Sequence, residues 1–106
     1  MLGINLKQMM NKDKFFKKTK NLSVIKSKTG KATYSNFSLA GNILSFSRVE
    51  KDTVWKLDLL ELFEFYKKES FFNTSIIKAN LKHRTNSPAL AILMAIGACD
   101  KAGFKK

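Results

Sequence analysis

The stretch that decides the fold runs from residue 73 to residue 99 and reads NTSIIKANLKHRTNSPALAILMAIGAC. Between Pro88 and Ala98 it contains only apolar residues and one glycine, with no charge. A helix that is apolar on every side is normally buried, so other elements of the chain must surround this one. Ahead of it, Ile77 and Leu81 lie four residues apart, which predicts a short amphipathic helix with one buried side. We therefore expect two helices, the second of them in the core, joined by a polar turn.

The polar turn between the two helices is the first candidate binding site. Ser87 followed by Pro88 is a typical helix start, because the hydroxyl can cap the helix and proline lacks an N–H that the first turn leaves unpaired. Backbone N–H groups at a helix start favour an anion, and nearby cationic side chains add to this preference. We expect the site to use polar residues of the first helix and of the turn: Lys78, Asn80, Lys82, His83, Arg84, Thr85 and Asn86.

A further helix is predicted just before this stretch, beginning at Asp58. Asp58 and Glu61 have the spacing of a capping box, in which the first carboxylate accepts from amides of the first turn and the second reaches back. Capping and solubility account for the acidic residues of this helix, so they do not indicate catalysis. An apolar stripe at helical spacing predicts its buried side: Leu59, Leu62, Phe63 and Tyr66.

Between residues 21 and 57 the hydrophobic period changes from helical to alternating, and turn residues recur at short intervals. This pattern predicts strands over 22–25, 32–37, 43–49 and 53–57. In the third of these, Leu44 and Phe46 share a face with Arg48, and the opposite face is more polar. We expect an antiparallel meander of three or four strands with one face buried.

The opening segment places apolar residues at approximate helical spacing among many lysines, which predicts a basic amphipathic helix. Asn11, Lys12 and Asp13 weaken this pattern, so a frayed arm is the alternative. Such a helix can dock on its own domain, bind nucleic acid or lie on a membrane. The predicted organisation is a basic helix or arm over 1–20 and one α+β domain over 21–106, with three C-terminal helices packed on one face of the sheet.

Charge and cysteine content bound the class of protein. The 106 residues carry a formal net charge of +12, and residues 1–31 alone hold nine lysines and one aspartate. A positive field of this size favours nucleic acid, an anionic membrane surface or an acidic protein as partner. The single cysteine, Cys99, excludes an internal disulfide and favours a reducing compartment, so we expect a cytoplasmic protein. The longest apolar run is shorter than the ~20 residues that a membrane span needs, and no signal-peptide pattern opens the sequence.

Motifs that would indicate an enzyme are missing from the sequence. One histidine and one cysteine are too few for a zinc site, and there is no phosphate-binding glycine loop or nucleophile elbow. His83 lies between Lys82 and Arg84, whose charges disfavour its protonation, so a general base is not indicated. We expect no catalysis, no metal and no cofactor.

Nucleic-acid binding through the phosphate backbone is the favoured hypothesis. Only two of the twenty basic residues are arginines, so bidentate recognition of bases is scarce and lysine contacts to phosphates predominate. Besides the turn, a second surface is predicted on the sheet, where basic and aromatic residues would form one face: Lys26, Lys28, Lys31, Tyr34, Asn36 and Arg48. The alternative is a non-catalytic accessory module of phage or mobile-element type that binds an acidic protein. The sequence disfavours a membrane surface as partner.

Overall fold

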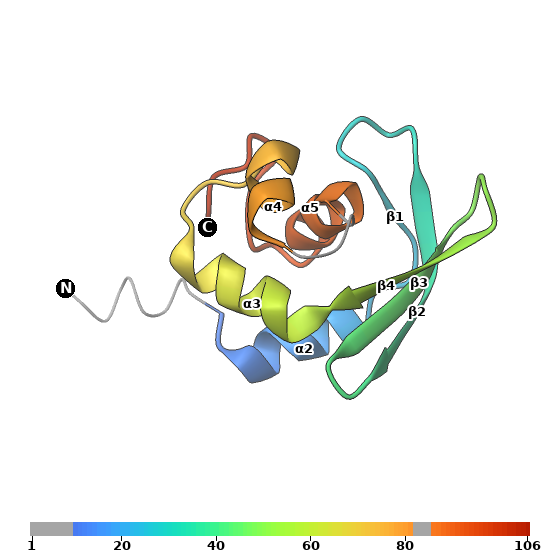
Figure 1. Cartoon of the computed structure of the whole chain (residues 1–106), viewed down its shortest axis with the longest axis horizontal. Helices are drawn as coiled ribbons and strands as arrows, with labels where there is room; N and C mark the ends of the chain where they lie inside the picture. The colour runs from blue at the N-terminus through green and yellow to red at the C-terminus, as the bar shows by residue number, and fades with distance from the viewer. Residues whose placement is uncertain (1–9, 82–85) are drawn as a thin grey trace.

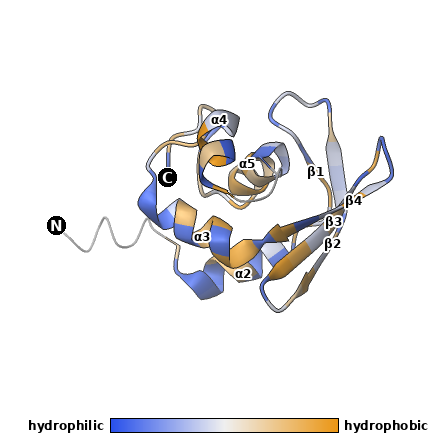
Figure 2. Cartoon of the chain, viewed as in Figure 1, coloured by the Kyte–Doolittle hydropathy of each residue, from blue (hydrophilic) through white to orange (hydrophobic). Residues whose placement is uncertain are grey.

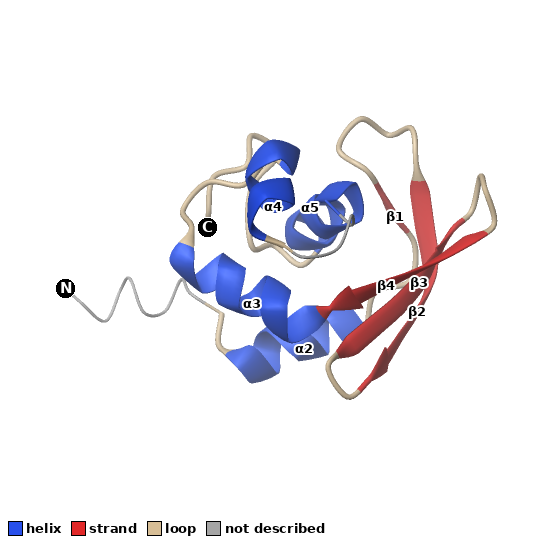
Figure 3. Ribbon diagram, in the orientation of Figure 1, coloured by secondary structure: helices blue, strands red, loops and turns tan. Residues whose placement is uncertain are grey.

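The computed structural model describes residues 10–81 and 86–106 and has an α+β architecture (Figure 1). Four strands form one antiparallel sheet in the order β1-β2-β3-β4, so each strand lies beside its neighbour in sequence. The helices lie together on one side of this sheet (Figure 3). In chain order the elements are α2 (Lys12–Lys20), β1 (Ile25–Lys26), β2 (Thr33–Ala40), β3 (Ile43–Arg48), β4 (Thr53–Asp58), α3 (Leu59–Lys68), α4 (Thr74–Asn80) and α5 (Asn86–Ala95). The predicted meander followed by three helices is confirmed.

The inner face of the sheet follows the predicted alternation in β3. Leu44 and Phe46 are 0% and 1% exposed, and their partners across to β4 are Leu57 and Trp55. Arg48 lies on the same face, at the end of the strand, where it pairs with Tyr34 of β2. This face therefore runs from an apolar end to an end that carries polar side chains.

Strand β2 extends three residues beyond the predicted end because it contains an irregularity. The register with β3 shifts between Ser35 and Ser38, and Asn36 has a φ of +57°. Asparagine tolerates this left-handed conformation better than most residues. Tyr34 and Leu39 are five residues apart, which simple alternation would put on opposite faces, and the bulge brings both onto the inner face. The predicted strand over 22–25 is wrong in its bounds, since β1 contains only Ile25 and Lys26.

Helix α3 begins after its predicted cap, Asp58. The sequence allows Asn73 or Thr74 as the cap of α4, and Asn73 has that role. The Asp58 carboxylate accepts a hydrogen bond from the backbone N–H of Glu61 at 3.1 Å, and the Asn73 side chain accepts from Ile76 at 2.8 Å. The predicted core stripe of α3 is buried, and Phe65 is buried as well. In α4, Ile77 is buried as expected.

Helix α5 is the buried apolar helix, with different ends from those predicted. Residues 89 to 93 are all at most 3% exposed. The helix begins at Asn86, two residues before the predicted start, and Pro88 is still in the first turn, where no N–H is needed. It ends at Ala95, because Gly97 turns the chain with a φ of +80° and Ala98 donates back to the Leu93 carbonyl. No helix in the described residues is long and apolar enough to cross a membrane.

Helix α2 docks on α3 through one aromatic side chain. Phe15 is fully buried, and its ring lies 5.2 Å from that of Phe63 and 5.3 Å from that of Tyr66. Asn11 caps α2 by accepting from the backbone N–H of Lys14 at 2.8 Å, so the polar cluster starts this helix and does not disrupt it. Figure 2 shows hydrophilic residues along α2 on the side away from the rest of the molecule.

Candidate anion-binding site

A cleft of about 300 Å³ opens between the polar end of the inner sheet face and the start of α5. The β1–β2 loop forms one wall, the sheet forms the floor, and the first turn of α5 forms the other wall. In that order the lining residues are Ser27, Thr29, Lys31 and Ala32, then Tyr34, Arg48 and Trp55, then Asn86, Ser87 and Pro88. None of these residues is acidic, so the cleft presents cations, hydroxyls and N–H groups.

Two residues that line the cleft each carry a buried side-chain N–H without a hydrogen-bond partner in the described parts of the chain. These groups are the Arg48 Nε and the Trp55 Nε1, each with less than 1 Å² of its surface exposed. Both groups can donate and neither can accept. Leaving a buried donor unpaired costs about 1–3 kcal/mol, so each of these groups would gain from an acceptor, supplied by water or by a ligand.

Tyr34 adds a third polar group to the floor of the cleft. Tyr34 is only 2% exposed. Its hydroxyl makes no hydrogen bond to any residue within 10–81 and 86–106. Burial raises the pKa of Tyr34 above its usual 10.0, while the positive charge of Arg48 opposes that rise and the negative charge of Glu50 adds to it. The hydroxyl is therefore neutral at ordinary pH and can donate to an anion.

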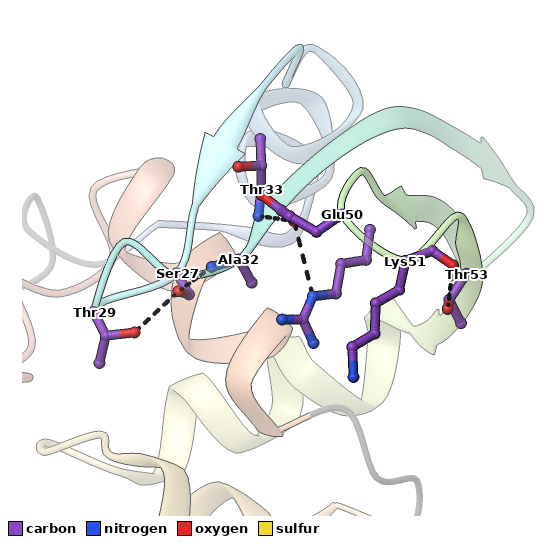
Figure 4. Close-up of polar contacts among 8 residues, drawn as sticks. Ser27, Thr29, Ala32, Thr33, Glu50, Lys51 and Thr53 are labelled. Carbon is purple, nitrogen blue, oxygen red and sulfur yellow. Dashed lines mark hydrogen bonds and ion pairs between the residues drawn. The ribbon is translucent and has the colours of Figure 1, made fainter.

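Glu50 is the one acidic group close to Arg48. One of its carboxylate oxygens accepts from the backbone N–H of Thr33 at 2.9 Å and lies 3.8 Å from the Arg48 Nε (Figure 4). Hydrogen bonding to Thr33 is the main reason that the pKa of Glu50 is lowered, and Arg48 contributes. A separation of 3.8 Å is an ion pair and not a hydrogen bond. The Arg48 Nε therefore has an ionic partner but makes no hydrogen bond.

The β1–β2 loop is shaped by its own hydrogen bonds. Ser27 accepts from the backbone N–H of Ala32 at 3.2 Å, and its hydroxyl is 3.4 Å from that of Thr29 (Figure 4). The Gly30 N–H donates to the Ser27 carbonyl at 2.9 Å, with Gly30 in the left-handed region at a φ of +78°. These contacts place the lysine that follows, Lys31, at the wall of the cleft.

The structure brings together only part of the predicted site. Lys31, Arg48 and Asn86 line the cleft, and Lys28 lines an adjoining hollow of about 170 Å³. Lys26 is exposed on β1. Lys82, His83, Arg84 and Thr85 lie outside the described residues.

The predicted contribution of α4 is not part of this site. The Asn80 amide donates to the Ile76 carbonyl of its own helix at 2.8 Å. Asn80 also lines a separate hollow with three carboxylates, those of Glu61, Glu64 and Glu69, and one lysine, Lys68. Acidic residues outnumber basic ones there, which disfavours a phosphate. Lys78 is exposed on the same helix and lines none of the three hollows described here.

The predicted flat binding face on the sheet is wrong. Tyr34 and Arg48 lie on the inner face, while Asn36 sits in the bulge and is exposed. Trp55 was missed as a site residue. The alternation of β4 could have indicated it, because Trp55 lies two residues before Leu57 and so shares its face of the sheet. A tryptophan N–H on an inner face needs a hydrogen-bond partner.

Lysines from both ends of the chain meet near the end of α5. The Lys18 ammonium lies 3.5 Å from the Ile96 carbonyl. Burial raises the pKa of the Cys99 thiol to about 11, with a further rise from Asp100, and the charges of Lys106 and Lys28 act in the opposite direction. Lys28 and Lys106 are thus close enough to the same buried thiol to act on it electrostatically.

Comparison with known proteins gives no assignment for this site. In the parts of the chain that the structure describes, no three histidine, cysteine or acidic side chains are grouped so as to hold a metal ion. No protein-family model, curated protein or solved structure matches the chain.

Proposed function

We propose that this protein binds nucleic acid through its phosphate backbone and holds one phosphate in the cleft. The observation that carries the proposal is a cleft without acidic lining residues in which Arg48 and Trp55 each carry a buried N–H that makes no hydrogen bond. Glu50, which is not a lining residue, forms an ion pair with the Arg48 Nε at 3.8 Å. A phosphate supplies several strong acceptor oxygens and a negative charge, which is what these donors lack. The guanidinium fork also matches the geometry of phosphate oxygens.

Lysines around the cleft could bind further phosphates of the same nucleic acid. Lys31 is on its wall, Lys28 lines the adjoining hollow, and Lys26 is exposed on the strand that leads into the loop. Since phosphates recur along a nucleic acid, neighbouring lysines can each neutralise one of them. The start of α5 adds partial positive charge at the Asn86 side of the cleft.

The balance of lysine and arginine supports binding with little sequence preference. Lysine contacts a phosphate as a point charge, whereas base recognition depends on planar, forked donors. Arg48, the one arginine in the described residues, lies on the floor of the cleft and not on an open helix or strand that could enter a groove. We therefore expect similar affinities for unrelated sequences.

The test is fluorescence anisotropy with labelled DNA and RNA oligonucleotides at low salt. Arg48→Gln should weaken binding by about tenfold to a hundredfold, because a hydrogen bond to a charged group contributes about 1.5–3 kcal/mol. Lys78→Gln removes an exposed lysine on α4, away from the cleft, and should have a much smaller effect. With about five phosphates neutralised, the log–log salt slope should be about −4 to −5 on a duplex and about −3.5 on a single strand.

Absence of binding to every DNA and RNA probe at low salt would refute the proposal. The basic surface would then be assigned to an acidic protein partner, which the net charge also favours. If Arg48→Gln and Lys78→Gln weakened the affinity equally, the protein would still bind nucleic acid, but the cleft would not be the binding site.

A further inference from the structure

The cleft is continuous with a second hollow along the β1–β2 loop. The smaller hollow, of about 170 Å³, shares three residues with the cleft: Ser27, Thr29 and Ser87. These three residues therefore form the rim between the cleft and the smaller hollow. Lys31 lines the cleft and Lys28 lines the smaller hollow, and both lysines belong to the β1–β2 loop.

The walls of the cleft combine donors with apolar and aromatic surface. Trp55, which is partly exposed, brings a ring to the floor, and Pro88 and Ala32 bring apolar surface to the walls. A phosphate alone would use only the donors. A volume of about 300 Å³ is at the lower end of the range for small-molecule sites, about 300–1,000 Å³, and so has room for more than a phosphate.

A regular duplex cannot use these features. Its bases are paired and stacked inside, and enzymes that need a base in a pocket must first extrude it at an energetic cost that is smallest for single strands. The cleft is concave and lies between the β1–β2 loop, the sheet and the start of α5, so a duplex can place a phosphate at its mouth but cannot bring a paired base into it. An unpaired nucleotide can enter with its base and its phosphate together.

We infer that the protein binds single-stranded nucleic acid, with one unpaired nucleotide in the cleft and the next along the Lys28 hollow. This inference rests on the proposed nucleic-acid function and adds the class of strand. In the cleft the base lies against the aromatic floor, and the phosphate accepts from Arg48 and the start of α5. The strand then crosses the rim at Ser27 and Thr29, where the hydroxyls face it, and its next phosphate meets Lys28.

The experiment compares one oligonucleotide, as a single strand and as a duplex with its complement, on the full chain. Trp55 is the only tryptophan, so its emission reports on the cleft alone. The single strand should bind about tenfold more tightly than the duplex and quench this emission, because stacking of one base on an aromatic ring accounts for about tenfold in affinity. Lys28→Gln should weaken single-strand binding by more than Lys78→Gln, which makes the same charge change on α4.

Variants at the cleft separate this inference from the proposed function. Glu50→Gln keeps the hydrogen bond from Thr33 and removes the negative charge near Arg48, so it should bind the single strand more tightly, opposite in sign to Arg48→Gln. This second variant tests the cleft even if Arg48→Gln fails to fold. Near-ultraviolet circular dichroism checks that each variant is folded.

Three outcomes overturn the inference. Equal affinity for strand and duplex without a change in Trp55 emission would leave nucleic-acid binding in place and remove the single strand from the cleft. A free nucleoside monophosphate that binds as tightly as the strand would make the cleft a nucleotide site. Failure of all these probes to bind would reject the proposed function together with the inference.

Discussion

The two ends of the inner sheet face are built by the same strands and serve different purposes. At one end Leu44 and Leu57 face each other, are almost fully buried, and belong to the hydrophobic core beneath the helices. At the other end Tyr34 and Arg48 are paired across the strands, beside a cleft, with unsatisfied donors. A single alternation of side chains thus supplies both the core and the candidate site.

The two ends differ in whether their buried polar groups are hydrogen-bonded. Buried polar groups are normally hydrogen-bonded, and the exceptions in a native structure call for an explanation. Here the exceptions lie next to each other at the open end of the sheet and not among the leucines. We expect changes at the apolar end to alter stability, and changes at the polar end to alter binding.

The largest expected effect is at the apolar end. Leu44→Ala should lower the free energy of unfolding by about 2–5 kcal/mol, because it removes a fully buried side chain and leaves a cavity. Urea unfolding followed by circular dichroism measures this loss. The folded fraction should bind oligonucleotide as wild type does. A loss of affinity as large as that of Arg48→Gln would break the distinction between the two ends.

At the polar end a substitution that removes an unpaired donor should change stability little. Trp55→Phe deletes the Nε1–H that lacks a partner and keeps an aromatic ring in β4. Relief of the unpaired group offsets the packing lost with the smaller ring, so the free energy of unfolding should stay within about 1 kcal/mol of wild type. Affinity for the single strand should fall all the same. A destabilisation like that of Leu44→Ala would show that Trp55 is a core residue only.

The smallest effect is confined to alkaline pH. Because the pKa of Tyr34 is raised above 10.0 in the folded protein, its contribution to stability is complete below pH 10 and is lost as pH rises further. Tyr34→Phe should therefore remove part of the fall in stability above pH 10 and change nothing at pH 7. Urea unfolding of both proteins at pH 7 and above pH 10 tests this. The Cys99 thiol also titrates in this range, but it is present in both proteins and its effect cancels in the difference.

Local signals in the sequence predicted most of the fold. Capping by Asp58 and Asn73 and the alternation of Leu44, Phe46 and Arg48 each depend on residues close together in the chain. The bounds of β2 could not be predicted, because the bulge at Asn36 reverses the alternation and is fixed by pairing with β3. The start of α5 was misplaced because Ser87 and Pro88 are equally compatible with the second and third helical positions.

The site was harder to predict because it is assembled from segments far apart in sequence. Arg48, Trp55 and Asn86 belong to three elements that meet only when the sheet and α5 pack together. Counting charges gave Lys31 and Arg48, which line the cleft, the same weight as Lys78, which does not. The carboxylates beside Asn80, which distinguish the α4 surface from the cleft, come from a different helix and are visible only in three dimensions.

The strand order also determines which edge of the sheet could pair with another chain. Within the described residues β4 pairs only with β3, so the opposite edge of this six-residue strand is not occupied by another strand. Val54 is 67% exposed on it, and such edges can act as templates for pairing with a second copy. Lys56 is exposed two residues further along, on the same face as Val54. In the antiparallel register that places Lys56 of one copy opposite Lys56 of another, the two ammonium groups would repel each other, and a charged side chain at a strand edge disfavours such pairing.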